Sequence, residues 1–201
     1  MIYTFQELLY KYRNYSNAKM KIKRLVDNGE IFYLGKGLYS DKEDNDECVI
    51  ASRLYGPSYI SFTYALGIYG LLLSSLPAIT CATFHKNKRK AYQLRDGKIY
   101  TYQNVPPQAF RNYLAEIETP DGNYLIATKE KAFADFLLNV PVQANYQDLK
   151  NTLYYEYNID LIQMSKLNKT ILLSLLKKYR GSNFKLFIEH YKEIMNGKLV
   201  D

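Results

Sequence analysis

Five cationic side chains lie close together near the start of the chain. Lys19, Lys21, Lys23 and Arg24 fall within one short stretch, and Lys36 follows in a turn flanked by glycines. Ammonium and guanidinium groups at this density neutralise phosphates and release their counterions, and the fork of an arginine can also recognise a base edge. These residue types therefore predict binding of a polyanion rather than the making or breaking of covalent bonds.

Catalytic side chains are sparse in this sequence. Its histidines are His85, in a basic stretch, and His190, near the C-terminus, and its cysteines are Cys48 and Cys81. Neither histidine has a neighbouring Cys, Asp or Glu at the spacing of a metal site or a catalytic triad, and the sequence contains no glycine-rich phosphate loop. We therefore predict a protein that is not an enzyme, with no catalytic residues, no metal and no cofactor.

A short helix is predicted to carry the first four cations. Ser16 is its predicted N-cap, and Gly29 lies just past its end, where a left-handed residue is common. The apolar positions recur with the helical period and form one stripe, made of Ala18, Ile22, Leu25 and Val26. The opposite face carries Asn17, Met20 and Arg24, with the three lysines beside it.

A tight hairpin is predicted directly after this helix. Residues 31–34 form its first strand, Gly35-Lys36 its turn, and residues 37–39 its second strand. Upstream, Thr4 and Glu7 have the spacing of a capping box and predict an earlier helix that ends near Tyr12. Two short helices followed by a hairpin are typical of a winged helix-turn-helix, whose second helix enters the major groove of DNA.

The predicted DNA-binding surface combines the outer face of the second helix with the hairpin, or wing. Its residues are Ser16, Asn17, Lys19, Met20, Lys21, Lys23, Arg24, Tyr33 and Lys36. The alternative is an ordinary amphipathic surface helix whose lysines are simply solvated, since charged outer faces are common on helices.

Charge is distributed unevenly along the 201 residues. The net charge is +7, made of +4 in residues 1–40, −4 in residues 41–47 and +7 in the remainder. The acidic stretch predicts a joint between an N-terminal domain, residues 1–40, and a C-terminal domain, residues 41–201. A basic head and a basic body favour an anionic partner that touches both, although solubility alone also accounts for the charge of the body.

The composition is that of a chain with a substantial apolar core. Its longest apolar stretch, residues 65–76, is too short for a membrane span, and the first residues lack the apolar segment of a signal peptide. The two cysteines are expected as reduced thiols in the core. Together these features predict a cytoplasmic protein that does not contact a membrane.

The fold class predicted for the whole chain is α+β, with a mixed α/β body and a mainly helical tail over residues 141–201. Helices are predicted over 47–55, 62–72, 128–138, 146–156, 168–179 and 183–195. Strands are predicted over 79–84, 91–94, 98–102, 113–118 and 123–126. Asp96-Gly97 and Pro120–Gly122 are predicted hairpin turns, and Ser61 and Thr128 are predicted helix caps.

Several short motifs from Gly37 onward, in this order and spacing, resemble the AbiEi family of antitoxins. The motifs are Gly37-Leu38-Tyr39, then Tyr59-Ile60-Ser61 with Ala65-Leu66 and Gly70-Leu71, then Ile126-Ala127 with Glu130-Lys131-Ala132 and Ala134-Asp135. With the basic helix, the resemblance covers roughly residues 5–140, and the helical tail matches only loosely. AbiEi proteins belong to type IV toxin–antitoxin systems, which act in abortive infection and phage defence.

The resemblance implies a repressor that binds operator DNA through its winged helix and controls its own operon. It also implies that the C-terminal domain helps DNA binding and counteracts a nucleotidyltransferase-like toxin, without the need for a stable complex. The basic residues that match in place are Lys19, Lys21, Lys23, Arg24 and Lys36. Lys131 and Asp135 are four apart on one helix, so we expect a surface ion pair or a charge preference of the helix start, with no role in chemistry.

A second basic patch is predicted in the loop that contains Lys86, Lys88, Arg89 and Lys90. It could contact DNA beyond the hairpin, the toxin, or nucleic acid bound to the toxin, and it could equally be a solvated approach to the following hairpin. The sequence leaves these alternatives open.

Two other function classes compete with the antitoxin. One is a stand-alone winged-helix transcription factor whose C-terminal body senses a ligand or oligomerises, and a neighbouring toxin gene distinguishes the two. The other is an enzyme or protein-interaction module whose basic helix is merely amphipathic, which a DNA-binding measurement distinguishes.

Overall fold

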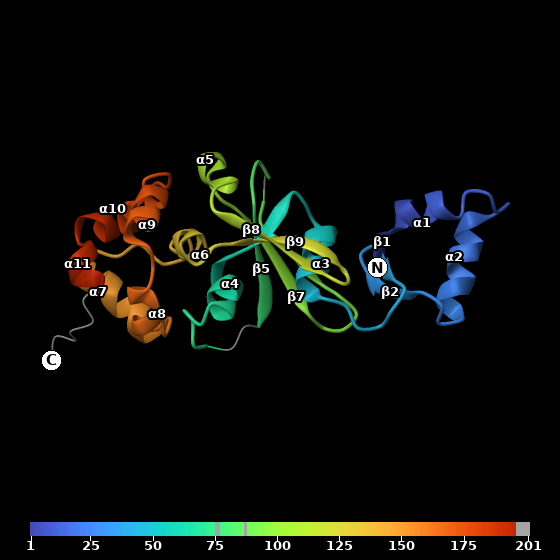
Figure 1. Ribbon diagram of the computed structural model, residues 1–201, viewed down its shortest axis with the longest axis horizontal. Helices are drawn as coiled ribbons and strands as arrows, with labels where there is room; N and C mark the ends of the chain where they lie inside the picture. The colour runs from blue at the N-terminus through green and yellow to red at the C-terminus, as the bar shows by residue number, and fades with distance from the viewer. Residues whose placement is uncertain (75–76, 87, 196–201) are drawn as a thin grey trace.

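The computed structural model describes residues 1–74, 77–86 and 88–195, and it has a mixed α+β architecture with two separate sheets. The predicted α+β class is confirmed at this level. Three parts follow one another along the long axis of the molecule (Figure 1): an N-terminal module of residues 1–40, a central body built on the larger sheet, and a group of C-terminal helices.

The N-terminal module contains two helices and a three-stranded antiparallel sheet in the order β1-β3-β2. Its elements are β1 (Ile2–Thr4), α1 (Phe5–Lys11), α2 (Ala18–Asp27), β2 (Phe32–Gly35) and β3 (Leu38–Ser40). The strand β1 was not predicted, because three residues are too few to show a period. It precedes α1 and pairs with β3, so it extends the hairpin sheet.

The body has a six-stranded mixed sheet in the order β6-β7-β5-β4-β9-β8. Its elements are α3 (Glu47–Leu54), β4 (Ser58–Ile60), α4 (Phe62–Ile68), β5 (Ala78–Thr83), β6 (Lys90–Gln93), β7 (Ile99–Asn104), α5 (Pro107–Phe110), β8 (Leu114–Thr119), β9 (Gly122–Ala127) and α6 (Lys129–Phe136). Both predicted hairpins are confirmed, as β6–β7 and β8–β9. The helix α3 lies on the side of the sheet that faces the N-terminal module, and α4 and α6 lie on the opposite side (Figure 1).

The C-terminal helices pack against α6 on the far side of the body. They are α7 (Tyr146–Asn151), the π-helical turn η1 (Thr152–Glu156), α8 (Leu161–Ser165), α9 (Lys169–Leu176), α10 (Ser182–Glu189) and α11 (Tyr191–Met195). The predicted helical tail is therefore confirmed, but α8 was missed and the last predicted helix is interrupted at His190. The helix predicted over residues 62–72 also ends earlier, at Ile68.

Two local predictions in the module were wrong by one residue. The N-cap of α2 is Asn17 rather than Ser16, because the side-chain oxygen Oδ1 of Asn17 accepts from the Met20 amide at 2.9 Å. The hairpin turn is Lys36-Gly37 rather than Gly35-Lys36: both residues are left-handed, with φ of 51° and 80°. Two left-handed central residues define the turn type whose twist matches the flanking strands.

Two predicted caps in the body lie at the N-cap positions but make no capping hydrogen bond. Ser61 and Thr128 precede α4 and α6 as predicted, but neither side chain bonds to the first turn of its helix. The Ser61 hydroxyl instead donates to the Asp135 carboxylate at 2.7 Å, so a distant partner replaces the local one.

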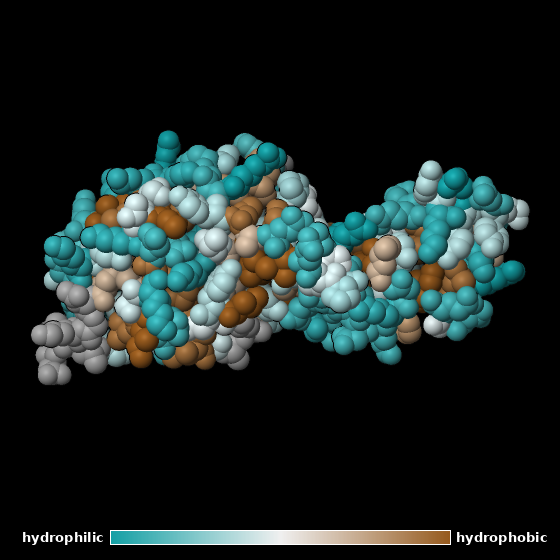
Figure 2. Space-filling model, in the orientation of Figure 1, coloured by the Kyte–Doolittle hydropathy of each residue, from teal (hydrophilic) through white to brown (hydrophobic). Residues whose placement is uncertain are grey.

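The molecule has two apolar cores of unequal size. The small core of the N-terminal module consists of Leu8, Ile22, Leu25 and Ile31. The large core runs through the body and the C-terminal helices, and it also takes in Ile2 and Leu38 from the inner side of the module sheet. Figure 2 shows the chain narrowing between module and body. The division into domains at residues 41–47 stays a prediction.

Candidate nucleic-acid interface

The helix α2 has the two faces that its sequence predicts. Ile22 and Leu25 are buried in the small core, and Ala18 and Val26 are half-buried beside them. Gly29 lies just past the helix with a φ of 72°, as expected for a helix end. The apolar stripe therefore fixes which side of α2 faces outward.

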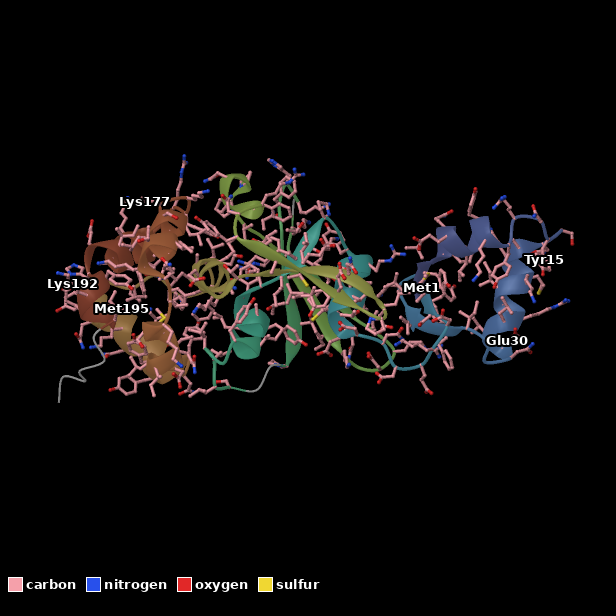
Figure 3. All side chains as sticks on the ribbon, in the orientation of Figure 1. Met1, Tyr15, Glu30, Lys177, Lys192 and Met195 are labelled. Atoms are coloured by element: carbon pink, nitrogen blue, oxygen red, sulfur yellow. The ribbon has the colours of Figure 1, made fainter. Side chains whose placement is uncertain are left out.

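The outward side of α2 is cationic. Six of the predicted site residues on this segment are exposed: Ser16, Asn17, Lys19, Met20, Lys23 and Arg24. Lys21 is half-buried, with its ammonium 5.6 Å from the centre of the Tyr15 ring. Among the described residues, none of these four cations has an ion-pair partner. In Figure 3, Tyr15 and Glu30 bracket α2 at the opposite end of the molecule from Lys177 and Lys192.

The hairpin presents one more cation and two aromatic rings. Lys36 is exposed at its tip. Tyr33 and Tyr39 pair across the two strands, with ring centres 5.0 Å apart, and both are half-buried. Burial raises the pKa of the Tyr39 hydroxyl, and neighbouring Tyr33 adds to the shift. Tyr33 is thus packed against Tyr39 and remains partly exposed.

A hollow of about 290 Å³ lies between α2 and the hairpin. Its lining residues are Phe5, Lys19, Ile22, Lys23, Val26, Asp27, Tyr33, Tyr39 and Arg95. Three of them are cations and one is an acid, over an apolar and aromatic floor. Arg95 comes from the turn between β6 and β7 and was not among the predicted site residues. That turn was predicted, but no local pattern shows which distant surface a turn will meet.

The structure brings the predicted second basic patch only partly together. Lys86, Lys88 and Lys90 line a hollow of about 420 Å³ with Tyr55 and His85. The ammonium of Lys86 donates to the Gly56 carbonyl at 3.1 Å and lies 4.9 Å from the Tyr55 ring centre.

Arg89, the fourth member of that patch, is engaged elsewhere. Its guanidinium donates to Asn139 at 3.3 Å. This loop belongs to the body and lines a different hollow from the cations of α2.

The pair Lys131 and Asp135 is not a surface ion pair, and this prediction was wrong. Both side chains are fully buried, at 0% exposure, with Nζ and Oδ1 2.5 Å apart. The Asp135 carboxylate also accepts from the hydroxyls of Tyr59, Ser61 and Tyr179, at 2.9, 2.7 and 2.5 Å. The reason is that neighbouring elements cover α6 on all sides, so every residue from 130 to 136 is buried.

The described residues offer little for bond chemistry. Among them, no group of three or more His, Cys, Asp or Glu is placed to hold a metal ion. Both cysteines are buried free thiols, and burial raises the pKa of Cys48 to about 12, which suppresses the thiolate at neutral pH. In this part of the chain, no helix is long and apolar enough to cross a membrane.

No protein-family model matches this sequence, and no curated protein matches it either.

Proposed function

We propose that this chain binds double-stranded DNA through α2 and the β2–β3 hairpin, as a winged helix-turn-helix. The observation that carries the proposal is the outer face of α2. Its exposed cations have no ion-pair partners among the described residues, while its apolar stripe holds it on a small sheet that ends in a cationic hairpin tip. A helix of this width fits the major groove, and a neighbouring hairpin then reaches the adjacent backbone.

The residues divide into two roles within this proposal. Arg24 lies on the outward face of α2 and is our candidate for reading a base edge, because its planar fork matches paired acceptors. Lys19, Lys21 and Lys23 flank that face, and Lys36 lies at the hairpin tip. Their ammonium groups suit phosphate oxygens, which carry no sequence information.

We further propose that the protein is a cytoplasmic, non-enzymatic antitoxin that represses its own operon and counteracts a nucleotidyltransferase-like toxin. The support is the resemblance to AbiEi antitoxins. Two of the motifs that carry it, Tyr59–Ser61 and Glu130–Asp135, come from distant parts of the sequence and meet in one buried hydrogen-bond network. The motifs of a family are expected to lie in contact when they stabilise the same part of the family's fold.

A ligand-sensing transcription factor is the second candidate. It is favoured by a cleft of about 660 Å³ between the module and the body, whose lining includes Phe32, Leu34 and Leu94. A volume of this size falls in the range of small-molecule sites.

The experiment for the DNA-binding proposal uses the full chain and the DNA upstream of its gene, with a scrambled duplex of equal length. We expect preference for the upstream DNA that persists when the salt concentration is raised. Arg24→Ala should weaken binding by about 1–3 kcal/mol and reduce the preference, and Lys21→Ala should weaken binding to both duplexes alike. Arg111→Ala and Lys177→Ala are matched controls, because both residues are exposed on the body or the C-terminal helices. Equal, salt-sensitive binding to both duplexes would contradict sequence-specific repression.

The antitoxin proposal needs a separate experiment. Expression of the neighbouring gene in a host should arrest growth, and co-expression of this chain should restore it. The absence of any toxic neighbour, combined with specific DNA binding, would favour the ligand-sensing transcription factor.

A further inference from the structure

The turn between β6 and β7 is attached to the hairpin of the N-terminal module. The Arg95 amide donates to the Leu34 carbonyl at 3.2 Å, which joins the body to β2 through the backbone. At Gly35, an added Cβ would lie 3.2 Å from the Leu94 side chain, so the two elements approach closely. This turn is therefore one of the contacts that hold the hairpin against the body.

The side chain of Arg95 lies on the same surface as the cations of α2. It is exposed, its guanidinium carbon lies 5.8 Å from the centre of the Tyr33 ring, and it lines the hollow that Lys19 and Lys23 also line. Lys19 and Lys23 are four residues apart and thus on one side of α2. Among the described residues, none of the three cations is in an ion pair, and the hollow offers them one acid, Asp27.

Three cations that share a small hollow without carboxylate partners repel one another unless an anion neutralises them. The geometry points to a phosphate-binding site in this hollow: we propose that it holds one phosphate of the DNA backbone, and that Arg95 of the body completes it. This inference rests on the proposed DNA-binding function. It names one residue of the body, Arg95, that was not among the predicted DNA-binding residues, and the phosphate site that it completes.

The chemistry of the three side chains suits this ligand. A guanidinium presents parallel N–H donors that match two phosphate oxygens, whereas an ammonium acts as a point charge. The aromatic ring beneath Arg95 limits the directions in which the guanidinium can point, so less freedom is lost on binding. A phosphate contact of this kind strengthens binding to any sequence and adds to its salt dependence.

The test compares Arg95→Ala, Arg95→Lys and the control Arg111→Ala in the full chain, with upstream and scrambled duplexes over a range of salt concentrations. Arg95→Ala should weaken binding to both duplexes by the same factor, about tenfold, and lower the slope of log K against log salt by about 1. Arg95→Lys should keep most of the slope because it keeps the charge. Arg111→Ala should behave as the unmodified protein.

Two results would overturn the inference. One is an Arg95→Ala variant with the affinity and salt slope of Arg111→Ala, while Arg24→Ala still loses binding. The other is a loss of thermal stability in Arg95→Ala with an unchanged salt slope, which would make Arg95 a packing residue on Tyr33. If the unmodified protein binds neither duplex, the proposed function fails and this inference fails with it.

Discussion

The carboxylate of Asp135 accepts hydrogen bonds from three hydroxyls and one ammonium in the interior of the body. Burial lowers the pKa of Lys131, and the adjacent Asp135 carboxylate opposes that shift. Burying two charges is costly, and such a pair is stable only when further hydrogen bonds satisfy the remaining atoms. Here Tyr59, Ser61 and Tyr179 provide them. Because Tyr179 follows α9, the network also ties the C-terminal helices to the body.

Removal of one partner should therefore leave an uncompensated buried group. We expect Lys131→Met to lower the free energy of unfolding by about 3–5 kcal/mol, since Asp135 loses its counter-ion in the interior. Urea denaturation followed by circular dichroism measures this change. The control, Lys177→Met, alters an exposed lysine at the end of α9, the helix that contacts α6, and should stay within about 0.5 kcal/mol of the unmodified protein. A similar small change for Lys131→Met would mean that the pair contributes little.

At the scale of elements, two variants of the hairpin turn test its charge and its backbone conformation one at a time. Lys36 and Gly37 are both left-handed, and asparagine tolerates this conformation better than most residues. We expect Lys36→Asn to leave the free energy of unfolding within about 0.5 kcal/mol while lowering the salt slope of DNA binding by about 1. An unchanged slope would remove the hairpin tip from the interface.

Gly37→Ala provides the complementary change. It retains the charge of Lys36 but forces an alanine into a φ of 80°, with no neighbouring atom within 4 Å of the added carbon. The strain should cost about 1 kcal/mol of stability. Thermal unfolding of the two variants tests this assignment, and a stable Gly37→Ala together with an unstable Lys36→Asn would contradict the turn geometry.

Capping patterns and apolar periodicity predicted the elements that are determined by interactions between residues close in the sequence. The capping box of Thr4 and Glu7 forms as expected, with the Glu7 amide bonded to the Thr4 hydroxyl at 3.2 Å, and the apolar stripe of α2 faces the small core. Ser61 was also predicted as a helix cap, but its hydroxyl bonds to Asp135, 74 residues away. Contacts between residues so far apart in the sequence produce no local pattern from which they could be predicted.

The same distinction applies to the candidate site. The cations of α2 were found because they share one helix and one period. Arg95 was missed because its partner surface, the hairpin of the module, is 60 residues distant in the chain. The burial of Lys131 and Asp135 was missed because an i,i+4 pair has the same spacing on an exposed helix as on a covered one.

At the scale of the whole molecule, ion pairs join the module, the acidic joint and the body. Glu7 of α1 pairs with Arg53 of α3 at 2.6 Å, Asp121 of the β8–β9 turn pairs with Lys42 at 2.5 Å, and Glu47 pairs with Lys98 at 2.8 Å. Burial acts to raise the pKa of each carboxyl, but the hydrogen bonds and the adjacent cation outweigh it. The pKa values of all three carboxyls therefore lie below their ordinary values of 4.5, 3.8 and 4.5.

A carboxyl whose pKa is lowered by folding contributes stability above its unfolded pKa and loses that stability as the pH falls through the folded value. We expect the urea midpoint to fall steadily below about pH 5, because the unfolded chain takes up protons first. Asp121→Asn should reduce this decline, whereas Glu118→Gln, an exposed control on β8, should not. A midpoint that is level down to pH 3 would contradict a stabilising role for these pairs.

The most direct test of DNA binding through α2 and the hairpin is a titration of the isotope-labelled full chain with the upstream duplex, followed by the amide signals in NMR. We expect the signals of residues 18–27, 35–38 and 94–98 to shift together, and those of the C-terminal helices to remain in place. Shifts confined to residues 85–90, or no shifts at all, would contradict DNA binding through α2 and the hairpin.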